Sequence, residues 1–252
     1  MKTRINKTYG LGIVLTVVLA GTSLCAKEAV ANPLVDAEKL RTLSQDIAKD
    51  YFYVEQGIQA SSAKAGLKND LLALGTTIEK LKKEVKDPEA KRVVEFMSFS
   101  QEELQDTIKE GYSAENGGLV LDYTETLLEG SENIINQDKS KVESMEDVIN
   151  EMEFLLERAS KYYIAFRAGY TDDSNVIQAQ NAVKKFGILL KRIQEYNYPD
   201  EIKNGPVKKL LKYWPVSKDF YLGIKKSDLP TIVFISTKHM KRALDKLAKY
   251  HQ

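Results

Sequence analysis

Apolar side chains recur at intervals of three and four residues through most of the chain from Val35 onward, a spacing that places them on one face of an α-helix. The segments that carry this pattern are about 20 residues long, the usual length of a helix in a bundle. Two β-branched runs, 119–121 and 231–235, are also assigned to helices, because a lone strand between helices has nothing to pair with. The pattern predicts an all-α protein. The first apolar seam consists of Leu40, Leu43, Ile47, Tyr51, Val54 and Ile58.

A second seam follows the first at a distance of 112 residues, and each of its positions is again apolar or aromatic. Gly57, just after the first seam, falls on Gly169 at the same distance. We interpret this correspondence as an internal repeat of about 112–116 residues. The second seam consists of Met152, Leu155, Ala159, Tyr163, Phe166 and Tyr170.

Each copy of the repeat is expected to contain four helices. Pro88 and Pro199, each beside acidic residues, mark the start of the third helix in each copy. The prediction is therefore two tandem antiparallel four-helix units, 35–137 and 147–252, joined by a polar linker over 136–147. The second helices are expected at 69–85 and 175–196. The third helices run through 94–108 and 210–224, the latter kinked at Pro215, and the fourth helices are expected at about 116–137 and 227–252.

The first 31 residues have the pattern of a signal peptide. Lys2, Arg4 and Lys7 precede an apolar stretch of eleven residues, which is too short to span a bilayer comfortably. Cleavage is expected after Ala26 or Ala31; an uncleaved N-terminal anchor is the alternative. The sequence thus predicts a protein exported to the periplasm or the cell exterior.

The composition removes several classes of chemistry. With 37 basic and 36 acidic residues, the chain lacks a general basic footprint for nucleic acid. Two histidines, His239 and His251, and the single Cys25 argue against a metal site, a disulfide framework and a nucleophile–base pair. We therefore predict a non-enzymatic protein without a cofactor. Carboxylate runs such as 151–157 and the lysine-rich last quarter are interpreted as solvated helix faces, although the lysines could also bind an acidic partner or anionic headgroups.

Arg41 is the remaining candidate for a binding residue. It lies in the first two turns of the first helix, beside the seam, with Gln45 one turn further on. A guanidinium offers a planar fork of donors suited to an oxyanion, and a helix N-terminus adds a favourable field. From the residues alone, an ordinary surface arginine is the simpler interpretation.

The stretch 37–51 resembles the opening helix of PilJ-type sensor domains, the extracytoplasmic N-terminal domains of type IV pilus chemotaxis transducers. These domains are similar to the nitrate/nitrite sensor region of bacterial histidine kinases. The resemblance implies a tandem helical arrangement and a small anion, nitrate or nitrite, bound by Arg41 of each subunit at a dimer interface through the first helix, with Ser44 and Gln45 in support. The residues that match the family motif are Arg41, Leu43, Ser44, Gln45, Ala48 and Lys49.

The sequence also departs from that family. Asp46 stands where a second arginine is usual and could pair with Arg41 instead. The second copy has Glu153 in place of Arg41 and Leu156 in place of Ser44, so no equivalent anion site is expected there. The family usually leads into a transmembrane helix and a signalling module, and neither follows in this sequence, so the sensor is expected to act on a separate membrane-bound signalling or pilus-related protein.

Two functions follow from the sequence. The first is an exported, non-catalytic, sensor-like binding protein for a small oxyanion, with nitrate or nitrite as the expected ligand. The alternative is a structural or adaptor protein that kept the helical scaffold and binds a protein partner without a ligand. The retained Arg41, Ser44 and Gln45 favour the first function, whereas the charge change at Asp46 favours the second.

Overall fold

The helices begin where polar side chains can cap them. In the computed structural model, which describes residues 32–137 and 144–251, α1 (Pro33–Glu55) starts after Asn32, whose side chain accepts a hydrogen bond from the backbone of Leu34. Helix α3 (Pro88–Glu110) starts after Asp87 in the same way, and α5 (Met145–Arg167) starts with a capping box between Ser144 and Asp147. The predicted signal peptide and its cleavage positions lie outside the described residues.

The described residues form helices and no strands, so the predicted all-α fold is confirmed. Both β-branched runs are helical, 119–121 in α4 and 231–235 in α9. The remaining helical segments are α2 (Ala60–Glu84), α4 (Ala114–Asn136), α6 (Asp173–Glu195), α7 (Asp200–Ile202), a π-helical segment (Lys203–Val207), α8 (Lys208–Leu222, which contains Pro215) and α9 (Pro230–His251).

One predicted boundary is wrong. Helix α2 begins at Ala60, nine residues before the predicted start at Asn69. The chain reverses within four residues after α1, because Gly57 (φ 65°) and Gln59 (φ 50°) both adopt the left-handed conformation. In the first turns of α2 the buried apolar residues are Ala63 and Leu67, set among small and polar side chains, so the apolar pattern is weak there and shows the helix only later.

The helix boundaries correspond at the spacing of the predicted repeat. Helix α5 begins and ends 112 residues after α1, and both helices end in the same way. After α1, Ile58 N donates to Tyr53 O at 3.0 Å; after α5, Tyr170 N donates to Ala165 O at 3.0 Å. The repeat itself stays a prediction, consistent with these matching ends.

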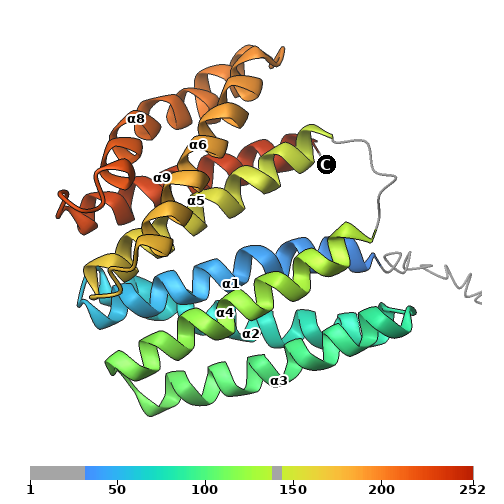
Figure 1. Cartoon of the computed structure of the whole chain (residues 1–252). Coiled ribbons are helices and arrows are strands. Elements are labelled where there is room, and N and C mark those ends of the chain that lie inside the picture. The colour runs from blue at the N-terminus through green and yellow to red at the C-terminus, as the bar shows by residue number, and fades with distance from the viewer. Residues whose placement is uncertain (1–31, 138–143, 252) are drawn as a thin grey trace, which may run out of the picture. The chain divides into compact units, whose positions relative to one another are not determined.

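Helices α1 and α5 lie at the centre of the unit Asn32–Gln252 (Figure 1). They pack against each other and run in the same direction; α1 also contacts α2 and α4, and α5 also contacts α6 and α9. Every residue of α1 from Leu43 to Tyr53, and of α5 from Phe154 to Ala165, is buried. Polar side chains in these stretches therefore lie in the interior, where each needs a partner.

Burial of α1 limits where a second chain could contact it. Over Leu43–Tyr53 its surface is covered by helices of the same chain, whereas Val35 and Lys39 in the first two turns are exposed. The predicted homodimer through the first helix would have to use these N-terminal turns. None of the described helices has the length and apolar character needed to cross a membrane.

Candidate functional site

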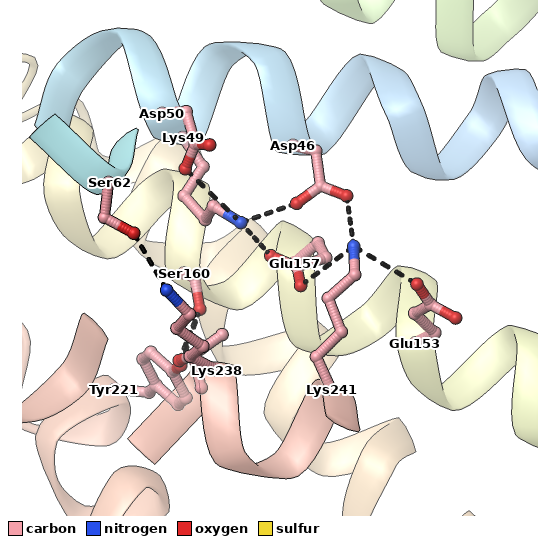
Figure 2. A network of polar contacts seen from close by, with 11 residues as sticks. Asp46, Lys49, Asp50, Ser62, Glu153, Glu157, Ser160, Tyr221, Lys238 and Lys241 are labelled. Atoms are coloured by element: carbon pink, nitrogen blue, oxygen red, sulfur yellow. Dashed lines mark hydrogen bonds and ion pairs between the residues drawn. The ribbon is translucent and has the colours of Figure 1, made fainter. Parts of the chain in front are cut away.

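A buried ion network joins α1 to α5. Lys49 Nζ donates to Asp46 Oδ1 at 2.5 Å on its own helix and to Glu157 Oε2 at 2.6 Å on α5 (Figure 2). The carboxylate of Asp50 lies next to it, with Oδ1 3.6 Å from the same ammonium group. Since the Glu157 side chain is fully buried, its pairing with Lys49 satisfies a charge that has no access to water.

A second lysine enters this network from α9. Lys241 Nζ lies 2.5 Å from Asp46 Oδ2 and 3.2 Å from Glu153 Oε1, and it approaches Glu157 Oε1 to 3.6 Å (Figure 2). Two ammonium groups therefore alternate with three carboxylates where α1, α5 and α9 meet. The 3.6 Å between Lys241 Nζ and Glu157 Oε1 is too long for a hydrogen bond.

Helix α2 closes the network on its remaining side, and a glycine makes this possible. A Cβ atom on Gly66 would lie 2.1 Å from Asp50 Oδ2, so only glycine allows the carboxylate to lie against the α2 backbone. Glycine inside a helix costs about 1 kcal/mol relative to alanine. The close approach of Asp50 explains why glycine occupies this position.

The network lines one wall of a hollow of about 220 Å³ between α1, α2, α5 and α9, which we call the acidic cavity. Its volume would hold several water molecules or one small organic molecule. Its uncharged lining includes Tyr53, Ser62, Phe234 and Thr237. Its charged lining consists of Asp46, Asp50, Asp70, Glu157, Lys49, Lys238 and Lys241.

Several polar groups at the acidic cavity lack partners among the described residues. The hydroxyl of Tyr53 and Oε1 of Glu157 are both buried and make no hydrogen bond within 32–137 and 144–251. The carboxylate of Asp70 has no ion-pair or hydrogen-bond partner within the same residues. Buried polar groups in native proteins nearly always have a partner. The Tyr53 hydroxyl and Glu157 Oε1 are therefore available to hydrogen-bond with water or a ligand in the cavity.

The carboxyl groups of the cavity differ in their acidity. Burial raises the pKa of Asp50 to about 6, and burial together with the neighbouring Asp46 charge raises the pKa values of Asp70 and Glu157 to about 7 each. Burial acts in the same direction on Asp46, but Lys241 and Lys49 outweigh it and hold the pKa of Asp46 well below its usual value. Asp46 therefore stays ionised, whereas Asp70 and Glu157 are partly protonated near neutral pH and Asp50 loses its proton at a somewhat lower pH.

The charge balance of the cavity adds to the effect of burial. Four carboxyl groups face three lysines, so full ionisation would leave one excess negative charge inside the protein. Lys238 contributes little to the interior because it is exposed, where its Nζ donates to Ser62 Oγ at 2.8 Å. An additional cation in the cavity would allow Asp70 and Glu157 to ionise.

The residues predicted to bind an oxyanion lie together on α1, but none of them lines the acidic cavity. Arg41 Nη2 pairs with Glu151 Oε2 at 2.7 Å, and its guanidinium lies 4.4 Å from the centre of the Phe154 ring. The hydroxyl of Ser44 donates to the carbonyl of Arg41 at 2.8 Å and accepts from Gln45 Nε2 at 2.9 Å. Ser44 and Gln45 are fully buried, so both serve the packing of α1 in this arrangement.

The ion pair between Asp46 and Arg41, which the sequence suggested as an alternative, is not formed. Asp46 binds Lys49 and Lys241, whereas Arg41 binds Glu151. The reason is geometric: Asp46 faces α9 and the acidic cavity, and Arg41 faces the first turns of α5. The charge change at Asp46 therefore does not neutralise Arg41 directly.

A second polar cluster lies on the other side of the α1–α5 pair. Glu125 of α4 accepts two hydrogen bonds of 3.0 Å from Arg158 and also pairs with Lys161, and Arg158 donates to Gln45 at 3.1 Å. Burial opposes ionisation of Glu125, but Lys161 and Arg158 lower its pKa to about 2. Its principal groups are mutually paired, so this cluster connects α4, α5 and α1 rather than offering free groups to a ligand.

The carboxylates of α5 are less exposed than the sequence predicts. The run 151–157 was interpreted as a solvated face, but Glu157 is fully buried and Glu153 is only partly exposed. The sequence contains one signal for buried carboxylates. Lys49 and Lys161 occupy equivalent places beside the two seams, and a lysine beside a buried apolar seam needs a carboxylate partner nearby. Asp70, Tyr53 and Lys241 line the cavity but are not predicted from the sequence as site residues.

The acidic cavity does not resemble a metal centre. Across residues 32–137 and 144–251, no group of three or more His, Cys, Asp or Glu side chains is arranged to hold a metal ion. The lysine ammonium groups of Lys49 and Lys241 occupy the positions between carboxylates that a metal ion would take.

No protein-family model, curated protein or solved structure matches this chain. The resemblance to PilJ-type sensor domains stays a prediction.

Proposed function

We propose that this chain is an exported, non-catalytic binding module whose acidic cavity holds a small ligand with an ammonium group. The observation that carries the proposal is a pair of buried atoms that make no hydrogen bond among the described residues, the Tyr53 hydroxyl and Glu157 Oε1, which border the same hollow as the Asp70 carboxylate. An ammonium group has three N–H donors and can satisfy oxygen acceptors from several directions. It would also offset the negative charge that Asp70 and Glu157 carry when they ionise.

The aromatic lining supports a cation as well. Tyr53 and Phe234 meet edge to face with their ring centroids 4.8 Å apart at the cavity. Aromatic faces attract ammonium groups through their quadrupole. Burial raises the pKa of Tyr53 well above its usual value, so its hydroxyl stays protonated and adds no competing negative charge.

An anion is less well matched to this cavity. Lys49 and Lys241 are each paired with carboxylates at 2.5–2.6 Å, and Lys238 is engaged by Ser62. An anion would have to break these pairs and would raise the negative charge further. The cavity therefore favours a cationic ligand over an oxyanion.

The position of the cavity favours a sensor-like role. A ligand there touches α1, α2, α5 and α9, so its binding affects how the two central helices are held together. A ligand shifts a conformational equilibrium only if it binds two states differently, and the ionisation of Glu157 beside Lys49 offers such a difference. We propose that this state passes to a separate partner, a membrane-bound signalling or pilus-related protein as the sequence resemblance implies.

Arg41 carries a second candidate function, the binding of nitrate or nitrite. One observation favours it: Arg41 Nε is buried and makes no hydrogen bond among the described residues, so part of its guanidinium is unsatisfied. Glu151 occupies the other side of that guanidinium at 2.7 Å and would have to move. If neither ligand binds, the adaptor alternative remains.

Thermal unfolding of the purified protein tests these functions together. Ethanolamine, methylammonium, nitrate, nitrite and chloride are compared at constant ionic strength. A ligand at one hundred times its Kd adds about 2.7 kcal/mol, which raises the midpoint by about 5–10 °C for a chain of this size. The proposal expects a rise with amines that is reduced in Asp70→Asn and retained in Asp106→Asn, whose side chain is 72% exposed on α3. A rise with nitrate alone, lost in Arg41→Ala, would favour the second candidate, and equal small shifts for all solutes would leave the adaptor.

A further inference from the structure

The acidic cavity has two chemically different ends. Ser62 and Asp70 both line it from α2, and their positions are eight residues apart, about 12 Å along the helix. The end near Asp70 is acidic, since the Asp46 charge acts on the Asp70 carboxyl. The end near Ser62 is basic, because Lys238 of α9 donates to Ser62 Oγ at 2.8 Å (Figure 2). A ligand that extends through the cavity therefore meets both kinds of charge.

We propose that the ligand of the acidic cavity is an amino acid, a small molecule that carries one ammonium group and one carboxylate. This inference rests on the proposed function and adds a second anchoring point for the same ligand. The ammonium group would lie at the acidic end, beside Glu157 and Asp70. The carboxylate would lie at the basic end, beside Lys238 and Ser62.

Two fully buried residues supply atoms that such a ligand would satisfy. Glu157 Oε1 and the Tyr53 hydroxyl make no hydrogen bond among residues 32–137 and 144–251, although neither residue has any exposed surface. Glu157 Oε1 can accept a hydrogen bond from an ammonium group. The Tyr53 hydroxyl can accept from an ammonium group and donate to a carboxylate. One amino acid can therefore satisfy both buried atoms.

The basic end suits a carboxylate. Within the described part of the chain, Lys238 pairs with no carboxylate, and the hydrogen bond it donates goes to the neutral hydroxyl of Ser62. Since Ser62 Oγ accepts that bond, its own hydrogen can be donated to a ligand. Ser62 also lies in the first turn of α2, which contains no acidic residue and whose N-cap residue, Gln59, makes no capping hydrogen bond. The positive end of the helix dipole adds to the attraction of Lys238 for an anion.

An amino acid also leaves the existing ion pairs intact. Lys49 and Lys241 keep their carboxylate partners at 2.5–2.6 Å, because the carboxylate of the ligand would bind Lys238 instead. A simple amine would leave Lys238 without an anionic partner, and a simple carboxylic acid would leave Glu157 Oε1 unsatisfied. An amino acid serves both ends of the cavity and adds no net charge to the interior.

Titration calorimetry on the full protein tests the second anchoring point. The standard amino acids and 4-aminobutyrate are first compared by thermal unfolding at constant ionic strength. The amino acid that raises the midpoint most is then titrated, together with two analogues of the same carbon skeleton, the amine that lacks the carboxylate and the acid that lacks the ammonium group. The proposal expects the amino acid to bind at least about 10-fold more tightly than either analogue, because each analogue loses one charge-assisted contact.

A pair of matched variants assigns the carboxylate contact to Lys238. Lys238→Met removes an exposed ammonium group at the cavity and should reduce the affinity for the amino acid to about that of the amine, while the affinity for the amine should not fall. Lys246→Met removes the same charge from an exposed position on α9 outside the cavity and should leave both affinities unchanged.

The outcomes separate this inference from the function on which it rests. An amine that binds as tightly as the amino acid, or an equal loss of amino-acid affinity in Lys238→Met and Lys246→Met, would overturn the inference but keep the ammonium-binding function. An acid analogue that binds as tightly as the amino acid would overturn both, because the ammonium group would then contribute nothing. No binding of any of these compounds would also overturn both.

Discussion

Lys49 and Glu157 lie 108 residues apart in the sequence, and their side chains meet at 2.6 Å in the interior. This contact joins the central helix of one half of the chain to the central helix of the other. Asp46, Lys241 and the acidic cavity are arranged around it (Figure 2). The stability of the α1–α5 contact and the chemistry of the cavity therefore depend on the same pair.

Lys49→Met should destabilise the protein strongly. The substitution keeps an unbranched apolar stem but removes the ammonium group between Asp46 and Glu157, and breaking one side of a buried pair costs about 3 kcal/mol or more. Urea denaturation measures the change. Lys109→Met, which breaks an exposed pair with Asp106, should change stability by less than about 1 kcal/mol. Equal effects of the two substitutions would show that the Lys49 network does not stabilise the fold.

Stability should fall as the pH rises from about 5 to 7.5. Asp50, with a pKa of about 6, and Asp70 and Glu157, with pKa values of about 7, hold protons in the folded state over a range where the unfolded state has lost them. Since the folded state binds more protons there, the free energy of unfolding decreases with rising pH. Burial lowers the pKa of His251, which gives a smaller change of opposite sign.

The acid side of the profile should have the opposite slope. Lys241 and Lys49 outweigh burial to lower the pKa of Asp46, and Lys161 and Arg158 do the same for Glu125. The stability these groups provide is complete above their ordinary pKa values and is lost as the pH falls below about 4. Urea denaturation from pH 3 to 7.5 should therefore show a maximum near pH 5. The double substitution Asp70→Asn/Glu157→Gln should reduce only the fall in stability between pH 5 and 7.5. A stability that increases from pH 5 to 7.5 would contradict the raised pKa values of these carboxyl groups.

Two glycines in helix interiors should respond to alanine in opposite directions. Gly187→Ala in α6 meets no atom within 4 Å and should stabilise the protein by about 0.5–1 kcal/mol through helix propensity. Gly66→Ala places a methyl group against Asp50 and should destabilise it by about 1 kcal/mol, since overpacking outweighs the propensity gain. In an Asp50→Ala background, Gly66→Ala should become stabilising. Chemical denaturation of these variants gives the coupling free energy between Gly66→Ala and Asp50→Ala. A coupling of zero would mean that Asp50 does not lie against α2.

The helical fold could be predicted because its signals are local. The seam through Leu40, Ile47 and Tyr51 faces the interior, and the third helix of the first half begins at Pro88 after the cap at Asp87, as the sequence indicates. The start of α2 was predicted too late, because the turn depends on the unusual backbone conformation of Gln59, which residue type alone does not indicate.

The cavity could not be predicted, because it depends on helices that are distant in the sequence. Glu157 resembles a surface residue until α9 and α1 cover the face of α5 that carries it. An apolar seam indicates one buried face, whereas α1 and α5 are buried all round in their central turns. Asp70 lies on a helix with many exposed polar residues, and only the packing of four helices brings it to the same hollow as Tyr53.

Proton release on ligand binding tests the central claim most directly. Ethanolamine is titrated into the protein at pH 6.5 by calorimetry in two buffers of different ionisation enthalpy. A cation in the acidic cavity favours the ionised forms of Asp70 and Glu157, so binding should release protons, and the release should disappear in Asp70→Asn/Glu157→Gln. Proton uptake, or binding without any proton exchange in the unsubstituted protein, would contradict the claim that an ammonium ligand occupies the cavity between these carboxyl groups.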